Sequence, residues 1–182
     1  MGSYIKGKNI LAVDDEQDIL ETIEDILEEA NLDCAGNYQE ASEKIKQKQY
    51  DIVILDIMGV NGMKLLEESV QRNIPAVMLT AHSINPDSLM ESIRKGAIAY
   101  LPKEILAKLD DMLNKLLEAC EKGEAPWKML FQELGDYFDK RFGANWKKRD
   151  HKFWSEFSAS YQIGKGIQER LMHDEKILGR GI

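Results

Sequence analysis

Short apolar runs alternate with longer amphipathic stretches through the first two thirds of the chain, and this alternation constrains the fold more than any other feature. A run of four or five apolar residues suits a strand buried on both faces, whereas apolar residues at every third or fourth position indicate a helix. The runs occupy 9–13, 52–55, 76–79 and 98–101, and 33–36 is a weaker fifth candidate. Strands alternating with helices in this way predict an α/β fold, a parallel sheet covered on both faces.

The helical patterns lie after these runs, and several have clear start signals. The first covers 16–30. Asn37 with Glu40 three residues later is an N-cap and capping-box pair, and Asn85-Pro86 is an N-cap followed by proline at the first helical position. Gly62 opens another helix, and a final one carries an apolar face from Leu106 to residue 120. Each strand candidate is therefore followed by a helix.

Polar residues follow the apolar runs and define a candidate site. In open parallel sheets, ligands bind beyond the carboxyl ends of the strands. The residues at or just past those ends are Asp14, Asp15, Asp56, Thr80 and Lys103. The pattern therefore predicts three carboxylates, a hydroxyl and an ammonium group at one edge of the sheet.

These groups together are chemically complete for phosphoryl transfer to Asp56. Clustered carboxylates repel one another unless a cation joins them, and hard oxygen ligands favour Mg²⁺. An aspartate can act as a nucleophile toward phosphorus and form an aspartyl phosphate. A lysine then pairs with the phosphoryl oxygens, a hydroxyl donates a hydrogen bond, and the metal neutralises developing charge.

Each of these residues alone has an ordinary structural interpretation. An Asp-Asp pair after a strand is more often a cap or a turn, a loop lysine is usually solvated, and a strand-end threonine usually bonds the backbone. Asp56 is different, because a carboxylate directly after four apolar residues is poorly placed for solvation. The order and placement of all the groups favour the functional interpretation.

Four segments resemble, in family order, the signature segments of bacterial two-component response regulator receivers. They are Val-Asp-Asp-Glu at 13–16, Ile-Leu-Asp-Ile-Met at 54–58, Met-Leu-Thr-Ala at 78–81 and Gly-Ala-Ile-Ala-Tyr-Leu-Pro-Lys at 96–103. The resemblance extends from residue 8 to about 120. It implies a flavodoxin-like (βα)5 receiver with a five-stranded parallel sheet, and a sensor histidine kinase or phosphotransfer protein as the phosphoryl donor.

The resemblance implies a role for each matching position. Asp56 would accept the phosphoryl group and, with Asp15, bind Mg²⁺ directly, while Asp14 would bind it largely through water. The backbone carbonyl of Met58 would supply a further ligand, and Lys103 would pair with a phosphoryl oxygen.

The same resemblance implies a switch. Thr80 would move toward the phosphate and Tyr100 would change rotamer in response. Ala81 is small, as the family prefers beside the donor's approach path, and Met58 and His82 occupy positions that resemble those tuning dephosphorylation.

Two features depart from the family pattern. Family members usually have a proline and a longer loop after the acceptor aspartate, whereas here only 57–61 precede Gly62. The loop geometry and the switching rate are therefore open. Many receivers also place a proline, often cis, after the lysine; here Glu104 follows Lys103, so a trans bond is expected.

The chain changes character near residue 122. Residues 1–124 have 13 basic and 24 acidic side chains and only four aromatic ones, all Tyr, whereas the remaining residues have 11 basic against 8 acidic ones and ten aromatics. Such a shift predicts two units, 1–122 as the receiver and 123–182 as a small all-α unit. Its helical stripes start at Trp127, at Phe153 and, as a third, at Ile167.

The C-terminal unit, residues 123–182, matches no output family. Its aromatic residues are expected to form a small core, to pack on the receiver, or to pair with a second copy. The basic run from Lys140 to Lys152 could contact phosphate backbones, be a solvated face, or dock on the acidic receiver.

The leading hypothesis is a phosphoacceptor switch, not an enzyme, that controls binding to a downstream protein or homodimerisation. The alternative is a transcriptional regulator with an atypical basic helical DNA-binding unit. A third, less favoured, is an enzyme with an unrecognised site in 125–182, where no cluster of His, Cys and carboxylates supports catalysis. No stretch is apolar enough to span a membrane and no signal-peptide core is present, so a cytoplasmic protein without membrane insertion is expected.

Overall fold

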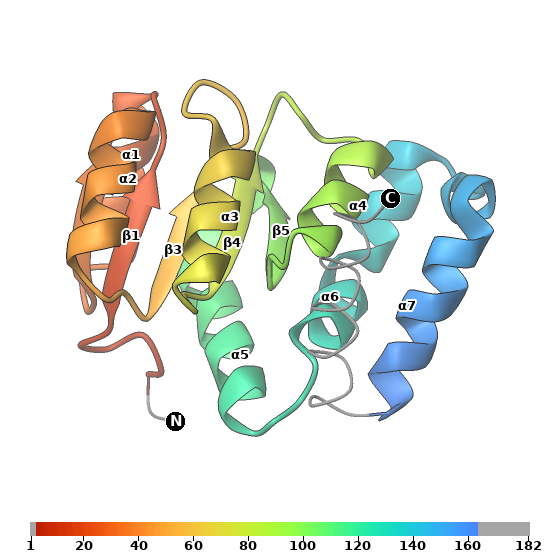
Figure 1. Cartoon of the computed structure of the whole chain (residues 1–182). Coiled ribbons are helices and arrows are strands. Elements are labelled where there is room, and N and C mark those ends of the chain that lie inside the picture. The colour runs from red at the N-terminus through yellow and green to blue at the C-terminus, as the bar shows by residue number, and fades with distance from the viewer. Residues whose placement is uncertain (1–2, 164–182) are drawn as a thin grey trace.

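Five parallel strands form a single sheet in the order β2-β1-β3-β4-β5 (Figure 1). The computed structural model describes residues 3–163, with side chains as far as Ser158. The strands are β1 (Asn9–Val13), β2 (Asn31–Ala35), β3 (Ile52–Leu55), β4 (Ala76–Thr80) and β5 (Ala99–Pro102). The predicted parallel sheet is confirmed, with β2 beginning two residues earlier than expected.

The helices complete the predicted flavodoxin-like arrangement. They are α1 (Gln17–Ile26), α2 (Tyr38–Gln47), α3 (Gly62–Gln71), α4 (Pro86–Arg94) and α5 (Leu109–Glu121). α1 packs against α5, and α2 packs against α3. Every residue of β3 and β4 is buried, as parallel strands covered on both faces require.

Both predicted asparagine caps are present. Asn37 Oδ1 accepts a hydrogen bond from the Glu40 N–H at 2.9 Å, and Asn85 Oδ1 accepts one from the Ser88 N–H at 2.8 Å. Pro86 occupies the first turn of α4, where its missing N–H has no cost. These caps fix where α2 and α4 begin, and so fix the loops that lead to them from the carboxyl edge of the sheet.

The helix predicted to include Leu106 begins later than expected. Lys103–Lys108 form the 3₁₀ helix η1, and α5 starts at Leu109. Leu106 is half-buried, whereas Leu109 and Leu113 are fully buried. Leu106 continues the apolar repeat, but its backbone follows the tighter 3₁₀ path that short connectors commonly adopt.

Two helices follow α5 and confirm two of the three stripes predicted for the C-terminal unit. They are α6 (Pro126–Phe142), which ends at Gly143, and α7 (His151–Ile163), joined by the 3₁₀ helix η2 (Trp146–Asp150). The apolar faces of both helices are buried; the buried residues are Trp127, Leu130, Leu134, Phe138, Trp154 and Phe157. The third stripe lies outside the described residues.

α6 lies alongside the edge strand β5 and packs against α5 (Figure 1). The Trp127 indole N–H donates a 2.8 Å hydrogen bond to the carbonyl of Ala97, just before β5. The guanidinium of Arg94 on α4 lies over the Phe153 ring of α7, 4.7 Å from its centroid. Of the alternatives left open for this unit, packing on the (βα)5 unit is confirmed by these contacts. The edge of the sheet at β5, which could otherwise pair with another strand, is flanked by a helix. The division at residue 122 stays a prediction.

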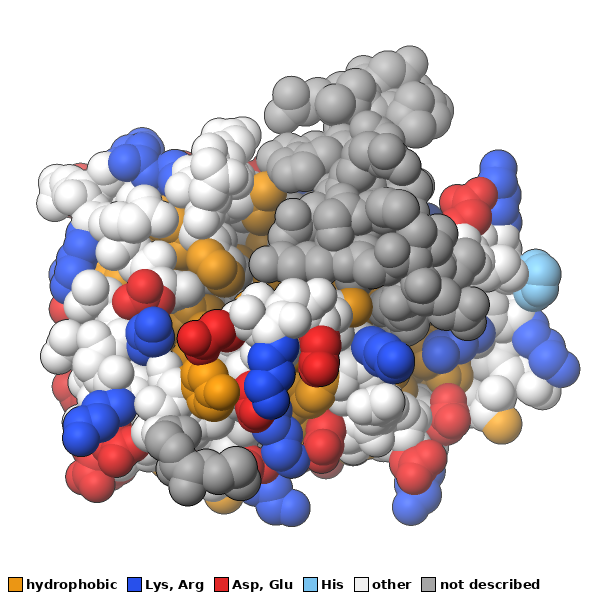
Figure 2. All heavy atoms as spheres, turned by 90° about the horizontal axis from the view of Figure 1, so that it is seen from below, with side chains coloured by type: hydrophobic (Ala, Val, Ile, Leu, Met, Phe, Trp, Pro, Cys, Tyr) orange, Lys and Arg blue, Asp and Glu red, His pale blue; other side chains and the backbone are white. Residues whose placement is uncertain are grey.

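No helix in the described part of the chain is long and apolar enough to cross a bilayer. Seen from below, Lys and Arg side chains lie interspersed with Asp and Glu (Figure 2). Among the described residues visible on this face, acidic and basic side chains are therefore mixed.

Candidate functional site

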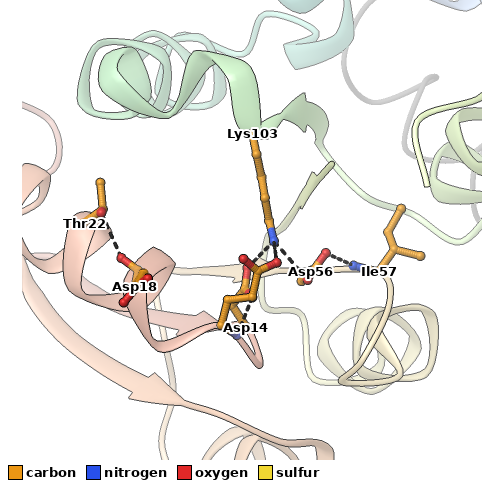
Figure 3. A network of polar contacts seen from close by, with 7 residues as sticks. Asp14, Asp18, Thr22, Asp56, Ile57 and Lys103 are labelled. Carbon is orange, nitrogen blue, oxygen red and sulfur yellow. Dashed lines mark hydrogen bonds and ion pairs between the residues drawn. The ribbon is translucent and has the colours of Figure 1, made fainter. Parts of the chain in front are cut away.

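Lys103 lies between two buried carboxylates at the carboxyl edge of the sheet (Figure 3). Its Nζ is 2.7 Å from Asp14 Oδ2, 3.2 Å from Asp56 Oδ2 and 3.5 Å from Glu16 Oε1. Asp14 follows β1, Asp56 follows β3 and Lys103 follows β5. Three strand ends thus converge as the sequence predicts, and the side chains of Asp14 and Asp56 are almost completely buried.

The surroundings of Asp56 disfavour its negative charge. Burial and the neighbouring charge of Asp14 raise the pKa of Asp56 to about 6, although Lys103 and the Ile57 N–H, at 2.9 Å from Asp56 Oδ1, act in the opposite direction. Burial alone would lower the pKa of Lys103, but Asp14 and Asp56 outweigh it and raise that pKa. Lys103 is therefore a permanent cation that only partly balances the carboxylates around it.

Two glycines shape the short loop after Asp56. Gly59 has φ +83°, and a Cβ at this position would lie 2.3 Å from Asp15 Oδ2. A Cβ on Gly62 would lie 1.8 Å from the backbone oxygen of Asp56, while the Gly62 N–H donates to the Ile57 carbonyl at 3.0 Å. The chain can fold back this tightly only because neither residue has a side chain.

An acidic cluster at the end of β1 suits a divalent cation. Asp14, Asp15 and Glu16 each place a carboxylate oxygen within 4.8 Å of the others. Hard oxygen ligands, surplus negative charge and a buried Asp56 with a raised pKa fit Mg²⁺. Glu16 was not predicted as part of this cluster; its position directly after Asp15 was the available signal. The Met58 carbonyl stays a prediction as a ligand.

Thr80 presents a buried hydroxyl with no hydrogen-bond partner among the described residues. Buried polar groups are nearly always paired, so an unpaired donor at the end of β4 favours an incoming acceptor oxygen at this edge. The predicted movement of Thr80 itself stays a prediction.

Tyr100 is fully buried with its hydroxyl held at the start of α4. The hydroxyl is 2.6 Å from Ser88 Oγ, donates to the Ser83 carbonyl at 3.0 Å and accepts from the Asn85 N–H at 3.3 Å. A change of rotamer would break all three contacts, so the inward position is a defined state from which a switch could start.

Met58, Ala81 and His82 form none of the hydrogen bonds or ion pairs found around Asp56 and Lys103 in the described part of the chain. Met58 is an exposed large hydrophobic residue, 57% accessible, and His82 is exposed as well. Ala81, directly after β4, is half-buried. Their roles in donor approach and dephosphorylation stay predictions.

The fold and this edge together define a flavodoxin-like α/β domain with an acidic cluster and a buried Asp56–Lys103 pair at the carboxyl edge of its sheet. The family profile for the response regulator receiver domain matches residues 10–117, more than half of the chain. The chain therefore belongs to the response regulator receiver family.

Curated relatives and solved structures agree with this assignment. The chain is 34% identical over 122 residues to the phosphate regulon transcriptional regulatory protein PhoB of Pseudomonas aeruginosa, covering 60% of this chain and 53% of that protein. It is 31% identical to the two-component response regulator ARR12 of Arabidopsis thaliana, covering 59% and 19%. The CheY-like receiver structure from Methanospirillum hungatei JF-1 superposes with a TM-score of 0.58 at 27% identity, covering 64% and 98%. The chain spans about half or less of the curated relatives' length.

Proposed function

We propose that this chain is a two-component response regulator in which Asp56 accepts a phosphoryl group, with Mg²⁺, from a sensor histidine kinase or phosphotransfer protein. The observation that carries this proposal is the pairing of the buried Asp56 carboxylate with Lys103 beside an acidic cluster. The family assignment supports it, since the receiver profile spans the three strand ends that supply these residues.

In this proposal, a carboxylate oxygen of Asp56 attacks the phosphorus of a phosphohistidine in line with the P–N bond. The new O–P bond forms as the P–N bond breaks, and the imidazole leaves with the electron pair of that bond. Lys103 lies within ion-pair distance of Asp56 and balances charge on the phosphoryl oxygens. The Thr80 hydroxyl, which has no hydrogen-bond partner in the described part of the chain, donates to one of those oxygens.

Asp14, Asp15 and Asp56 would hold the Mg²⁺ ion, with the carbonyl of Met58 as a further ligand. Glu16 lies close enough to contribute to the same negative field. When bound, the ion neutralises charge that builds up on the transferring group. Within the chain itself, the Ile57 N–H fixes one oxygen of Asp56 through a 2.9 Å hydrogen bond.

The proposed output is protein interaction or self-association controlled through α6 and α7, and the chain acts as a phosphoacceptor and not as an enzyme on other substrates. The aromatic residues of α6 and α7 contact α4 and β5, as the Arg94–Phe153 and Tyr100–Phe138 contacts show. A change at the carboxyl end of β5 therefore has a direct path to these helices.

Intact-mass spectrometry tests the phosphoacceptor. Incubation with acetyl phosphate and Mg²⁺ should add the mass of one phosphoryl group, and Asp56→Asn or chelation of the metal should abolish the gain. Asp51→Asn is the matched control, because Asp51 directly precedes β3, whereas Asp56 directly follows it, and Asp51 is exposed. An Asp56→Asn protein that is labelled as fully as the wild type would refute the assignment.

The alternative function, transcriptional regulation through DNA binding, draws on the basic run and on the name of the PhoB relative. Lys147 in that run is exposed, but its Nζ lies over aromatic rings, 4.8 Å from the centroid of Phe131 and 5.2 Å from that of Trp154, and partial desolvation beside these rings lowers its pKa. Lys148 and Lys152 are exposed, with Asp150 between them. Because Lys147 packs against aromatic rings and Asp150 interrupts the basic run, protein interaction is the primary proposal.

A further inference from the structure

Glu104, the residue directly after the site lysine, contacts α6. Tyr137 donates its hydroxyl hydrogen to Glu104 Oε1 at 2.9 Å, and Arg141 Nη1 lies 3.5 Å from the same oxygen. Lys103 and Glu104 open η1 side by side, and their side chains diverge, one toward Asp14 and Asp56 and the other toward α6. Two adjacent Cα atoms, about 3.8 Å apart, thus connect the candidate phosphorylation site to the C-terminal helices.

The two α6 residues that contact Glu104 share one face of the helix. Tyr137 and Arg141 are four residues apart, so they lie one above the other on that face. Phe138, next to Tyr137, contacts Tyr100 of β5. α6 therefore contacts the chain on both sides of Lys103, at Tyr100 in β5 and at Glu104 in η1.

The two contacts to Glu104 differ in expected strength. The Glu104–Arg141 ion pair is exposed, with side chains 60% and 47% accessible, so water screens it strongly. The Tyr137 hydroxyl is the nearer partner, at 2.9 Å against 3.5 Å for Arg141 Nη1, and Tyr137 is half-buried. Burial and the hydrogen bond to Glu104 raise the pKa of Tyr137 to about 12, so the hydroxyl stays a donor over the whole neutral range. Hydrogen bonds to a charged acceptor are among the stronger ones. The connection therefore depends mainly on Tyr137.

We propose that Glu104 is a positioning residue: through Tyr137 it couples the position of Lys103 to the docking of α6. This inference rests on the proposed function, because it assigns a second effect to phosphorylation of Asp56. Lys103 is now shared between Asp14 and Asp56, at 2.7 and 3.2 Å. A phosphoryl group on Asp56 moves the negative charge outward, and Lys103 follows it with the start of η1. That displacement moves Glu104 relative to Tyr137 and so changes the geometry of the hydrogen bond between them.

Coupling between two sites is reciprocal in free energy. If the position of Lys103 alters the docking of α6, then the contacts between α6 and Glu104 alter how strongly Lys103 pairs with the phosphoryl group. Loss of Tyr137 or of the Glu104 carboxylate should therefore change two quantities together, the response of α6 to phosphorylation and the lifetime of the aspartyl phosphate. A merely structural hydrogen bond would change neither.

The protein supplies its own reporter for the first quantity, because all three tryptophans, Trp127, Trp146 and Trp154, lie in the C-terminal unit. Tryptophan emission of the full chain is measured with Mg²⁺ before and after beryllofluoride, a phosphate mimic. The lifetime of the aspartyl phosphate is measured after labelling with acetyl phosphate. The variants are Glu104→Ala, Tyr137→Phe and their double combination. The matched control is Lys115→Ala, which removes the 3.1 Å ion pair between Lys115 of α5 and Glu133 of α6.

Glu104→Ala and Tyr137→Phe should each lose most of the emission change and alter the lifetime by about fivefold, at the low end of coupling between sites. The double variant should match either single one, because both remove the Glu104–Tyr137 hydrogen bond and the exposed ion pair to Arg141, which is lost only with Glu104, contributes little. Lys115→Ala should behave as the wild type. Wild-type behaviour of both single variants, additive effects in the double variant, or an equal loss in Lys115→Ala would overturn the proposal.

Failure of the proposed function would look different. A wild-type protein that gains no phosphoryl group on Asp56 would refute that function itself. A protein phosphorylated on Asp56 but without any emission change would leave the function standing and refute the coupling through Glu104.

Discussion

Phe138 of α6 packs against Tyr100 of β5, with ring centroids 6.1 Å apart and ring planes tilted by 56°. Both side chains are fully buried, and Phe138 also stacks on Phe142 at 5.6 Å. The tyrosine that the family resemblance identifies as a switch residue is therefore in contact with the C-terminal unit. The apolar core of the receiver continues into α6 at this point.

Replacing Phe138 with alanine should destabilise the whole protein. Truncating a fully buried phenylalanine typically lowers the free energy of unfolding by about 3–5 kcal/mol. Phe142→Ala should cost less, because Phe142 is only half-buried. Urea unfolding followed by tryptophan emission measures both. Equal, small losses would show that α6 is not part of the cooperative core.

Gly62 should tolerate no side chain. In Gly62→Ala the new Cβ would collide with the backbone oxygen of Asp56 at 1.8 Å, so the loop must move and Asp56 with it. We expect weakened phosphorylation by acetyl phosphate and a lower melting temperature. Gly135→Ala is the control: a Cβ there would meet no atom within 4 Å beyond the adjacent backbone of its own helix, and alanine should stabilise the interior of α6 by about 1 kcal/mol. Equal behaviour of the two variants would contradict this account of the loop.

The convergence of Asp14, Asp56 and Lys103 could be predicted from the sequence because a parallel sheet brings all its carboxyl ends to one edge, whatever the loops between them. The docking of α6 could not. An apolar stripe shows that a helix face is buried but not what covers it, and nothing near Trp127 in the sequence identifies the Ala97 carbonyl as its partner. The later start of α5 could not be predicted either, because Leu106 fits the apolar repeat equally well in a 3₁₀ turn.

Lys103→Ala should leave the fold and Mg²⁺ binding largely intact but impair phosphorylation or its readout. Lys103 meets the carboxylates and contributes no apolar packing to the core, so its loss mainly removes charge balance. Metal binding can be followed by calorimetry, and phosphorylation by intact mass. Lys108→Ala, an exposed lysine at the end of η1, is the control. Full phosphorylation with an unchanged emission response in Lys103→Ala would refute its role.

The metal-free protein should lose stability as pH rises through the weakly acidic range. The pKa of Asp56 is about 6 in the folded protein and near 4 in an unfolded chain, so the folded state binds more protons between these values. Its stabilising contribution is thus present below about pH 4 and lost by about pH 6. Asp56→Asn removes this dependence and should be the more stable protein at neutral pH in the presence of a chelator. Thermal melts at several pH values test this, and parallel curves for the two proteins would contradict it.

Phosphorylation should change how α4, β5 and α5 meet α6 and α7, and so alter assembly or partner binding. A shift beside Tyr100 reaches Phe138 directly, and α5 continues through residues 122–125 into α6. For such a switch to matter, contacts must differ between the two states by a few kcal/mol. Added negative charge at the edge that already holds Asp14, Asp15 and Asp56 can supply part of that difference.

Sedimentation and hydrogen exchange of the full chain, with and without beryllofluoride, test this output. We expect a change in assembly state or in exchange across residues 85–163, and Asp56→Asn should show neither. Identical assembly state and identical exchange with and without beryllofluoride would contradict this output and show that α6 and α7 do not respond to phosphorylation. Titration with duplex DNA at two salt concentrations, run on the same samples, separates the alternative. Binding that weakens steeply with salt and depends on the mimic would favour transcriptional regulation over protein interaction, because contacts to phosphate groups release counterions.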